Sequence, residues 1–175
     1  MKGYLAIRGA NCIGLVAGVS SGTAGRGAMA TTDRYVTRPG WTFWLIAVLA
    51  VLWNAFGCLD FTMTASRNPT YLAQVPPEII DWLDSAPSWT LVPWALGVWG
   101  GLAGSLLLLA RSGWAVPAFA VSLVGLAVSQ AWQFSAGMPE SMTTPGMLAM
   151  TACIWVIALG LLWFAWDKRR AGVLH

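Results

Sequence analysis

Charged residues are scarce in this sequence. They make up 10% of its 175 residues, whereas a water-soluble domain of this size carries about 25%. The mean hydropathy is +0.64, and no segment is polar enough to form a separate soluble domain. The low charge therefore excludes an ordinary soluble protein, and embedding in a membrane is the simplest explanation of the composition.

Interior histidine and clustered cysteine are also missing. The sole histidine is His175, so no histidine is available as an interior general base, metal ligand or haem ligand. The three cysteines, Cys12, Cys58 and Cys153, are far apart and have no metal-binding spacing. A glycine-rich phosphate loop, an HExxH motif, a nucleophile elbow and paired interior carboxylates are absent as well. We predict no catalytic residue, no metal site and no cofactor, and hence no enzyme.

Four long uncharged runs dominate what is present. The first contains nineteen uncharged residues from Trp41 to Leu59, which in a helix cover roughly 28 Å, about the thickness of the hydrocarbon layer. The four predicted spans are residues 41–64, 89–110, 114–136 and 147–166. The sequence therefore predicts an all-α membrane protein, with a bundle of four transmembrane helices in residues 41–166.

The basic residues predict the orientation of these spans. Nine of the ten fall on one side of the predicted membrane, and the exception is Arg67. The nine are Lys2, Arg8, Arg26, Arg34, Arg38, Arg111, Lys168, Arg169 and Arg170. Because lysine and arginine accumulate in cytoplasmic segments, we predict that both termini are cytoplasmic and that residues 167–175 form a basic cytoplasmic tail. This arrangement explains the basic residues without a nucleic-acid partner and leaves the lipid bilayer as the expected partner.

Residues 1–40 are predicted to form a disordered cytoplasmic tail, because they are rich in glycine, serine and alanine and lack a pattern of apolar residues. Two alternatives remain open. Residues 12–19 followed by Ala28-Met29-Ala30 resemble a signal peptide with its cleavage site, although cleavage there would invert the charge pattern. Met29 is also a candidate for the true translation start.

The segment between the first two spans, residues 65–88, is too long for a simple connection. Within it, residues 77–84 place four apolar side chains against three acids. This pattern predicts a short interfacial helix on the outer membrane surface. Such a helix could cap the end of the bundle, or it could contribute to recognition of a ligand.

Polar residues inside the spans are the candidates for a binding site. Asn54 and Asp60 share one face of span one, and Ser129 and Gln133 share a face of span three with Ser122. Asp60 either faces a water-filled cavity or lies at the outer headgroup level, where a carboxylate is solvated. The residues Asn54, Asp60, Ser129 and Gln133 therefore predict either an outward-facing polar pocket or a dry ladder of hydrogen bonds between helices.

Small residues recur every four positions on span two. The set comprises Gly97, Gly100, Gly101, Gly104 and Ser105. Small residues at this spacing let two helix backbones approach closely in lipid. The pattern predicts a packing face, and its partner could be span one, span three or a second copy of the chain.

Three segments carry a family resemblance. They are Trp53-Asn54-x-x-Gly57-x-x-Asp60-x-x-Met63-Thr64, Val98-Trp99-Gly100-Gly101-x-x-Gly104-Ser105 and Trp114-Ala115-Val116-Pro117. Across about residues 39–170 the chain resembles a group of small four-helix proteobacterial inner-membrane proteins that are often called sugar transporters. The resemblance implies a multi-pass protein of the bacterial inner membrane. The family name implies transport, but it supplies no mechanism or substrate that applies to particular residues here.

Two functions follow as expectations. The favoured one is a non-enzymatic interaction or accessory component of the membrane, which packs against a second copy or another membrane protein through the glycine face of span two. The alternative is a small-solute carrier of sugar type, whose outward-facing pocket uses Asn54, Asp60 and Gln133. The sequence contains no internal repeat of the kind common in transporters.

Overall fold

The computed structural model describes residues 39–175. Four long helices account for most of this part: α1 (Trp41–Ala65), α4 (Leu91–Leu109), α5 (Ala115–Ala136) and α6 (Pro145–Arg170). All four are long and apolar enough to cross a membrane, and the described residues contain no strand. The prediction of an all-α, four-helix membrane bundle is confirmed. The predictions for the N-terminal tail concern residues 1–38, which lie outside the described residues.

Four short elements connect the long helices. They are α2 (Pro69–Leu72), α3 (Pro77–Ser85), and the 3₁₀ turns η1 (Ser88–Thr90) and η2 (Glu140–Met142). The helix α3 is the short helix that the amphipathic pattern predicted. The helix α2 was not predicted. It begins where the Asn68 side chain accepts a hydrogen bond from the Tyr71 backbone N–H and where Pro69 fits the first turn.

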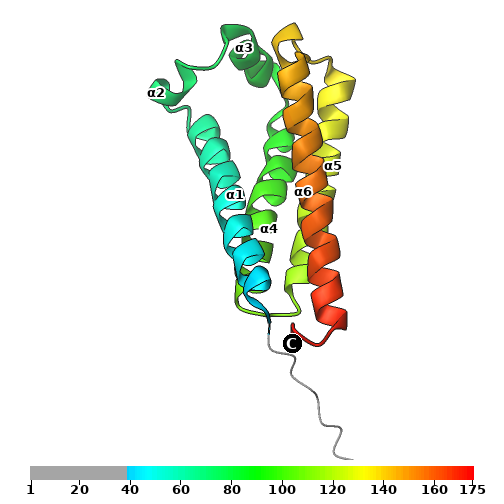
Figure 1. Ribbon diagram of the computed structural model, residues 1–175. Helices are drawn as coiled ribbons and strands as arrows, with labels where there is room; N and C mark the ends of the chain where they lie inside the picture. Colours follow the sequence, from blue (N-terminus) through cyan, green and yellow to red (C-terminus); the bar gives the residue numbers. More distant parts are fainter. Residues whose placement is uncertain (1–38) are drawn as a thin grey trace, which may run out of the picture. The chain divides into compact units, whose positions relative to one another are not determined.

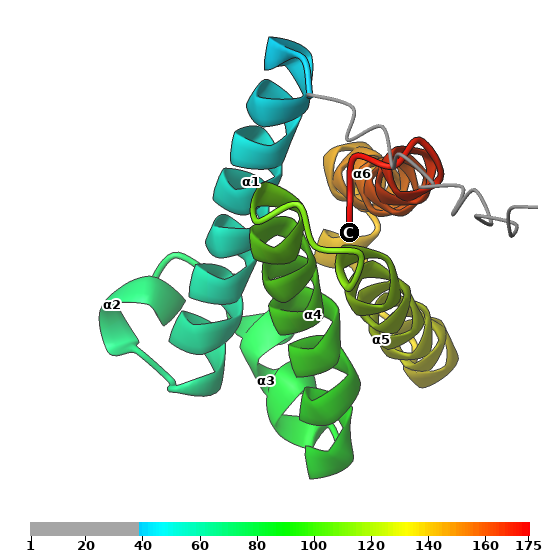
Figure 2. The ribbon, with the colours of Figure 1, turned by 90° about the horizontal axis from the view of Figure 1, so that it is seen from below.

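The long helices follow one another around an arc. The helix α1 packs along α4, α4 packs most extensively against α5, and α5 packs against α6 (Figures 1 and 2). The small residues of α4 allow this close approach, so α4 is the central helix. The helix α6 is the least buried of the four, and its buried side chains, Leu161 and Ala165, lie in its second half.

The helix α6 is longer than the predicted fourth span. We predicted that this span would end at Trp166 and that residues 167–175 would form a tail, but the helix continues to Arg170. Its last turn contains Lys168, Arg169 and Arg170, and cations are favourable there because the carbonyl end of a helix carries partial negative charge. The charges end the apolar span without ending the helix.

The described core lies at one end of the bundle, which we call the basic end because it carries Arg111 and residues 168–170. Phe43 of α1 stacks on Phe164 of α6 with ring centroids 6.0 Å apart. The remaining buried residues of this core are Ala47, Ala50, Leu108, Ala115, Phe119, Leu161, Ala165, Val173 and Leu174. Residues of all four long helices therefore meet at this end.

The chain after α6 folds back onto the turn between α4 and α5. The His175 N–H donates to the Arg111 carbonyl at 3.0 Å, and the Gly113 N–H donates to the His175 carbonyl at 2.9 Å. The preceding Val173 and Leu174 are buried, with exposed fractions of 6% and 4%. These contacts hold the tail against the basic end, where the sequence pattern predicted only a charged segment.

The opposite end of the bundle is covered by α3 and the loop around it. Trp82 of α3 lies against Trp132 of α5 with centroids 4.9 Å apart, and Trp89 contacts the same ring at 6.5 Å. An ion pair between Arg67 and Asp84 joins the start of the loop to α3. These contacts favour the capping interpretation of α3, and Figure 1 shows α3 at the end remote from His175.

Candidate functional site

Asn54 joins α1 to α4 in the middle of the bundle. Its carboxamide nitrogen donates to Ser105 Oγ at 3.0 Å and to the Ala50 carbonyl at 2.9 Å. Ser105 is fully buried and donates in turn to the Gly101 carbonyl at 2.8 Å. Because hydrocarbon offers no hydrogen-bond partners, such internal pairing is what a polar side chain in a span requires. The structure thus places Asn54 against span two, not against Ser129 or Gln133 of span three.

The glycine face of α4 is covered by α1 and α5 of the same chain. A Cβ atom at Gly101 would collide with Asn54 Oδ1, and one at Gly104 would lie 2.8 Å from the Phe119 ring. At Gly100 a Cβ would approach the Ser122 backbone to 3.2 Å, and at Gly97 the nearest atom is the Leu126 nitrogen at 3.4 Å. These four glycines, with Ser105, therefore serve packing within the bundle, one of the alternatives that the sequence left open.

Asp60 lies near the end of α1 and pairs with the loop. Its carboxylate accepts a hydrogen bond from the Tyr71 hydroxyl of α2. This hydrogen bond, together with partial burial and the negative charge of Asp60, raises the pKa of Tyr71 from 10.0 to about 12. The hydrogen bond between Tyr71 and Asp60 fixes α2 against the end of α1.

Ser129 and Gln133 form a third polar group on α5. The Gln133 carboxamide nitrogen lies 3.4 Å from Ser129 Oγ, and the Gln130 nitrogen lies 3.4 Å from Gln133 Oε1. Ser129 is buried and Gln133 is partly buried. All three residues belong to one helix. The four candidate pocket residues are thus distributed over three hydrogen-bonded groups, and no hydrogen bond in the described part of the chain connects one group with another.

No protein-family model, no curated protein and no solved structure matches this chain. The site therefore has to be assessed from its own geometry. Among residues 39–175, no group of three or more His, Cys, Asp and Glu side chains is placed to hold a metal ion.

Two grooves lie away from the candidate polar residues. The larger, of about 620 Å³, runs between α4 and α5 and is lined mainly by aliphatic side chains: Trp89, Val92, Pro93, Leu96, Ala120, Val121, Val124, Gly125 and Val128. The other lies between α5 and α6 at the basic end. Neither is lined by Asn54, Asp60, Ser129 or Gln133.

Two residues that matter for this geometry were not selected from the sequence. Tyr71 belongs to a loop without a periodic pattern, so its pairing with Asp60 had no sequence signal. Gly125 of α5 lies so close to α4 that a Cβ there would come within 2.6 Å of the Gly97 backbone nitrogen. The sequence did offer a signal for Gly125, because it is a lone glycine inside an apolar span and small residues mark close helix contacts.

Proposed function

We propose that this chain is a non-enzymatic, multi-pass protein of the bacterial inner membrane, with both termini in the cytoplasm, that acts as an interaction or accessory component. The observation that carries the proposal is the internal pairing of the polar side chains in its spans. Asn54 is hydrogen-bonded to Ser105, Asp60 to Tyr71 and Gln133 to Ser129. Groups committed to the fold are poorly suited to bind and release a solute.

We propose that the surface for a partner helix is on α6. Since α1 and α5 cover the glycine face of α4, we now assign the interaction to α6. Val156 is 70% exposed and Leu159 is 49% exposed on this helix, and a Cβ at Gly160 would meet nothing within 4 Å. An open backbone position beside apolar side chains permits the close approach by which helices associate in lipid. The proposed partner is a transmembrane helix of another membrane protein or of a second copy.

Site-specific photo-crosslinking in native membranes tests this assignment. A photoreactive residue replaces Val156 on α6, and the matched control replaces Val124 on α5, which is 64% exposed. We expect a discrete protein adduct from position 156 and lipid adducts alone from position 124. The adduct is identified by mass spectrometry and verified by a reciprocal pull-down. Lipid adducts alone at both positions would refute an interaction through α6.

Solute transport is the alternative, and the same residues decide it. A carrier would need Asn54, Asp60 and Gln133 to line one cavity, at least transiently. Wild-type protein in proteoliposomes should then take up a labelled sugar, and Gln133→Ala should abolish uptake without unfolding the bundle. Our proposal expects no uptake from a broad panel of sugars. Uptake that depends on Gln133 would replace it with a carrier function.

The proposed orientation has its own test. Single cysteines at Ser85 and Ser112, in a variant lacking the native cysteines, lie at opposite ends of the bundle. A membrane-impermeant thiol reagent applied to intact cells should label position 85 but not position 112. The reverse labelling pattern would place the basic end outside.

A further inference from the structure

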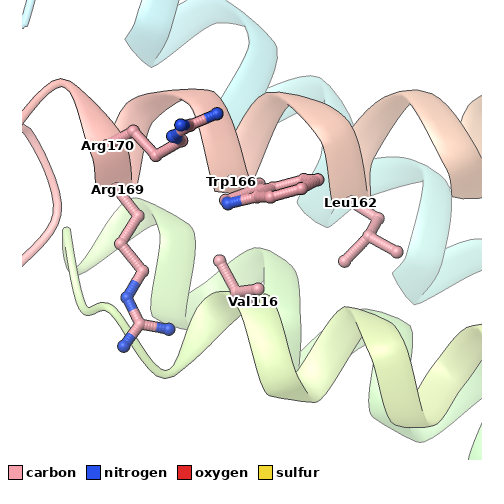
Figure 3. Close-up of a pocket in the computed structure, with 5 residues that line it drawn as sticks. All are labelled: Val116, Leu162, Trp166, Arg169 and Arg170. Atoms are coloured by element: carbon pink, nitrogen blue, oxygen red, sulfur yellow. The ribbon is translucent and has the colours of Figure 1, made fainter.

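A groove of about 360 Å³ opens between α5 and α6 at the basic end. Its lining combines apolar side chains with two guanidinium groups: Val116, Leu162, Trp166, Arg169 and Arg170. Figure 3 shows Leu162, Trp166 and Arg170 following one another along α6, with Val116 on α5 opposite and Arg169 reaching toward the α5 side. The groove is therefore apolar at the end lined by Leu162 and Val116 and cationic at the end lined by Arg169 and Arg170.

The two arginines of the groove are not held by the carboxylate next to them in the sequence. The carboxylate beside them belongs to Asp167, which forms an ion pair with Lys168 at a distance of 2.8 Å between Nζ and Oδ2. Arg169 and Arg170 have no ion pair with any described residue, and both are exposed. Arg111 adds a third guanidinium at the same end. Its Nε donates to the Val173 carbonyl at 3.2 Å, and one of its terminal nitrogens is buried without a hydrogen-bond partner among residues 39–175. The exposed Arg169 and Arg170 are therefore available to pair with an anion.

Trp166 orients one of these charges at the boundary of the span. The Arg170 guanidinium carbon lies 5.6 Å from the centre of the Trp166 ring, a distance at which the ring face attracts a cation. Trp166 is 55% exposed and the nearby Trp163 is 67% exposed. Indole rings favour the level of the lipid headgroups, so we expect the two arginines to lie at the depth of the phosphates.

We propose that this groove is a binding site for an anionic phospholipid. The headgroup phosphate lies between Arg169 and Arg170, and one acyl chain follows Leu162 and Val116 into the bilayer. A guanidinium presents parallel N–H donors that match two phosphate oxygens. With the basic end in the cytoplasm, as proposed above, the groove is also a basic pocket between spans of the kind that suits anionic headgroups. A soluble phosphate would use the arginines alone and leave the apolar half of the groove unused, so a membrane lipid fits the whole lining better.

Native mass spectrometry of lipid adducts tests the site. Protein in mild detergent is titrated with phosphatidylglycerol or with phosphatidylcholine of the same acyl chains, and the bound lipid is counted. We expect preferential retention of phosphatidylglycerol. Arg169→Gln and Arg170→Gln should each weaken it roughly fivefold, and the double variant about 25-fold, because one basic residue near an anionic surface contributes about that factor.

The matched control is Lys168→Gln in an Asp167→Asn background, compared with that background alone, because Lys168→Gln by itself would free the Asp167 carboxylate to pair with the arginines. Lys168 does not line the groove, so its removal should leave the affinity of that background unchanged. A loss equal to that of Arg169→Gln would show general attraction to the basic end and overturn the groove as a site. Equal retention of both lipids by wild type would also overturn it. If glycerol phosphate competes as strongly as the lipid, the proposal of a lipid site is overturned and the ligand is a soluble phosphate. Unchanged gel-filtration profiles and helical circular dichroism exclude misfolding of the variants.

Discussion

Asn54 Nδ2 and Ser105 Oγ lie 3.0 Å apart across the interface of α1 and α4, and this hydrogen bond joins side chains of the first two spans. The two residues are 51 positions apart in the chain. Each also bonds to a carbonyl one turn earlier in its own helix, Ala50 for Asn54 and Gly101 for Ser105. The hydrogen bond between the helices therefore adds to the one that each side chain already makes within its own helix.

A double-mutant cycle should measure this link. Asn54→Ala and Ser105→Ala, separately and together, should give a coupling free energy of about 0.6 kcal/mol and no more than about 1.7 kcal/mol, the range for hydrogen bonds between membrane helices. The measurement is unfolding in mixed micelles of increasing denaturing detergent. Ser135→Ala combined with Asn54→Ala is the control, because Ser135 bonds to the Trp132 carbonyl of its own helix. Zero coupling between Asn54 and Ser105 would contradict the observed link.

Gly125→Ala adds only one methyl group, but we expect it to destabilise the bundle strongly. The added Cβ would lie 2.6 Å from the Gly97 nitrogen and 2.7 Å from the Pro93 oxygen, so α4 and α5 would have to separate. Overpacking of this kind costs about 1–3 kcal/mol. Gly160→Ala is the matched control, since nothing lies within 4 Å of its Cβ. Detergent-induced unfolding of both variants checks the contrast, and equal stabilities would mean that α4 and α5 are farther apart than described.

The Tyr71 hydroxyl should titrate near pH 12 in the folded protein. Its pKa is raised above the ordinary value of 10.0 by the hydrogen bond to Asp60, by burial and by the charge of that carboxylate. A raised pKa means that the pairing stabilises the fold fully below pH 10 and loses this contribution as the pH rises through about 12. The difference in phenolate absorbance between wild type and Tyr71→Phe isolates this group. Asp60→Ala should return the transition toward pH 10, and an unchanged transition would remove Asp60 as the cause.

Leu174→Ala should destabilise the protein although the residue lies almost at the end of the sequence. Its side chain is 4% exposed in the core at the basic end, and truncation of a buried leucine costs about 2–5 kcal/mol. Leu106→Ala is the control, because Leu106 is 49% exposed on α4. Thermal unfolding in detergent compares the two. A Leu174 variant as stable as the Leu106 variant would show that the tail contributes nothing to the core.

The sequence was sufficient to predict the four spans and α3, because length, hydropathy and amphipathic spacing are local properties. It was not sufficient for contacts between distant segments. The hydrogen bond from Arg111 to Val173 joins residues 62 positions apart, and nothing in the basic tail indicated that Val173 and Leu174 would be buried. The glycine spacing on α4 predicted a packing face, but its partners, Asn54 and Phe119, depend on how the helices are arranged. Asp60 accepts its hydrogen bond from Tyr71. Because Tyr71 belongs to a loop with no regular pattern, the sequence could not predict this contact.

The position of His175 also has a practical consequence for handling the protein. Both its backbone N–H and its carbonyl are bonded to the turn at residues 111–113, in the manner of one step of a sheet ladder. A purification tag fused directly after His175 would begin inside this contact, beside the buried Leu174. His175 itself is exposed, so a spacer of several flexible residues would lead a tag away from the turn without disturbing these two hydrogen bonds.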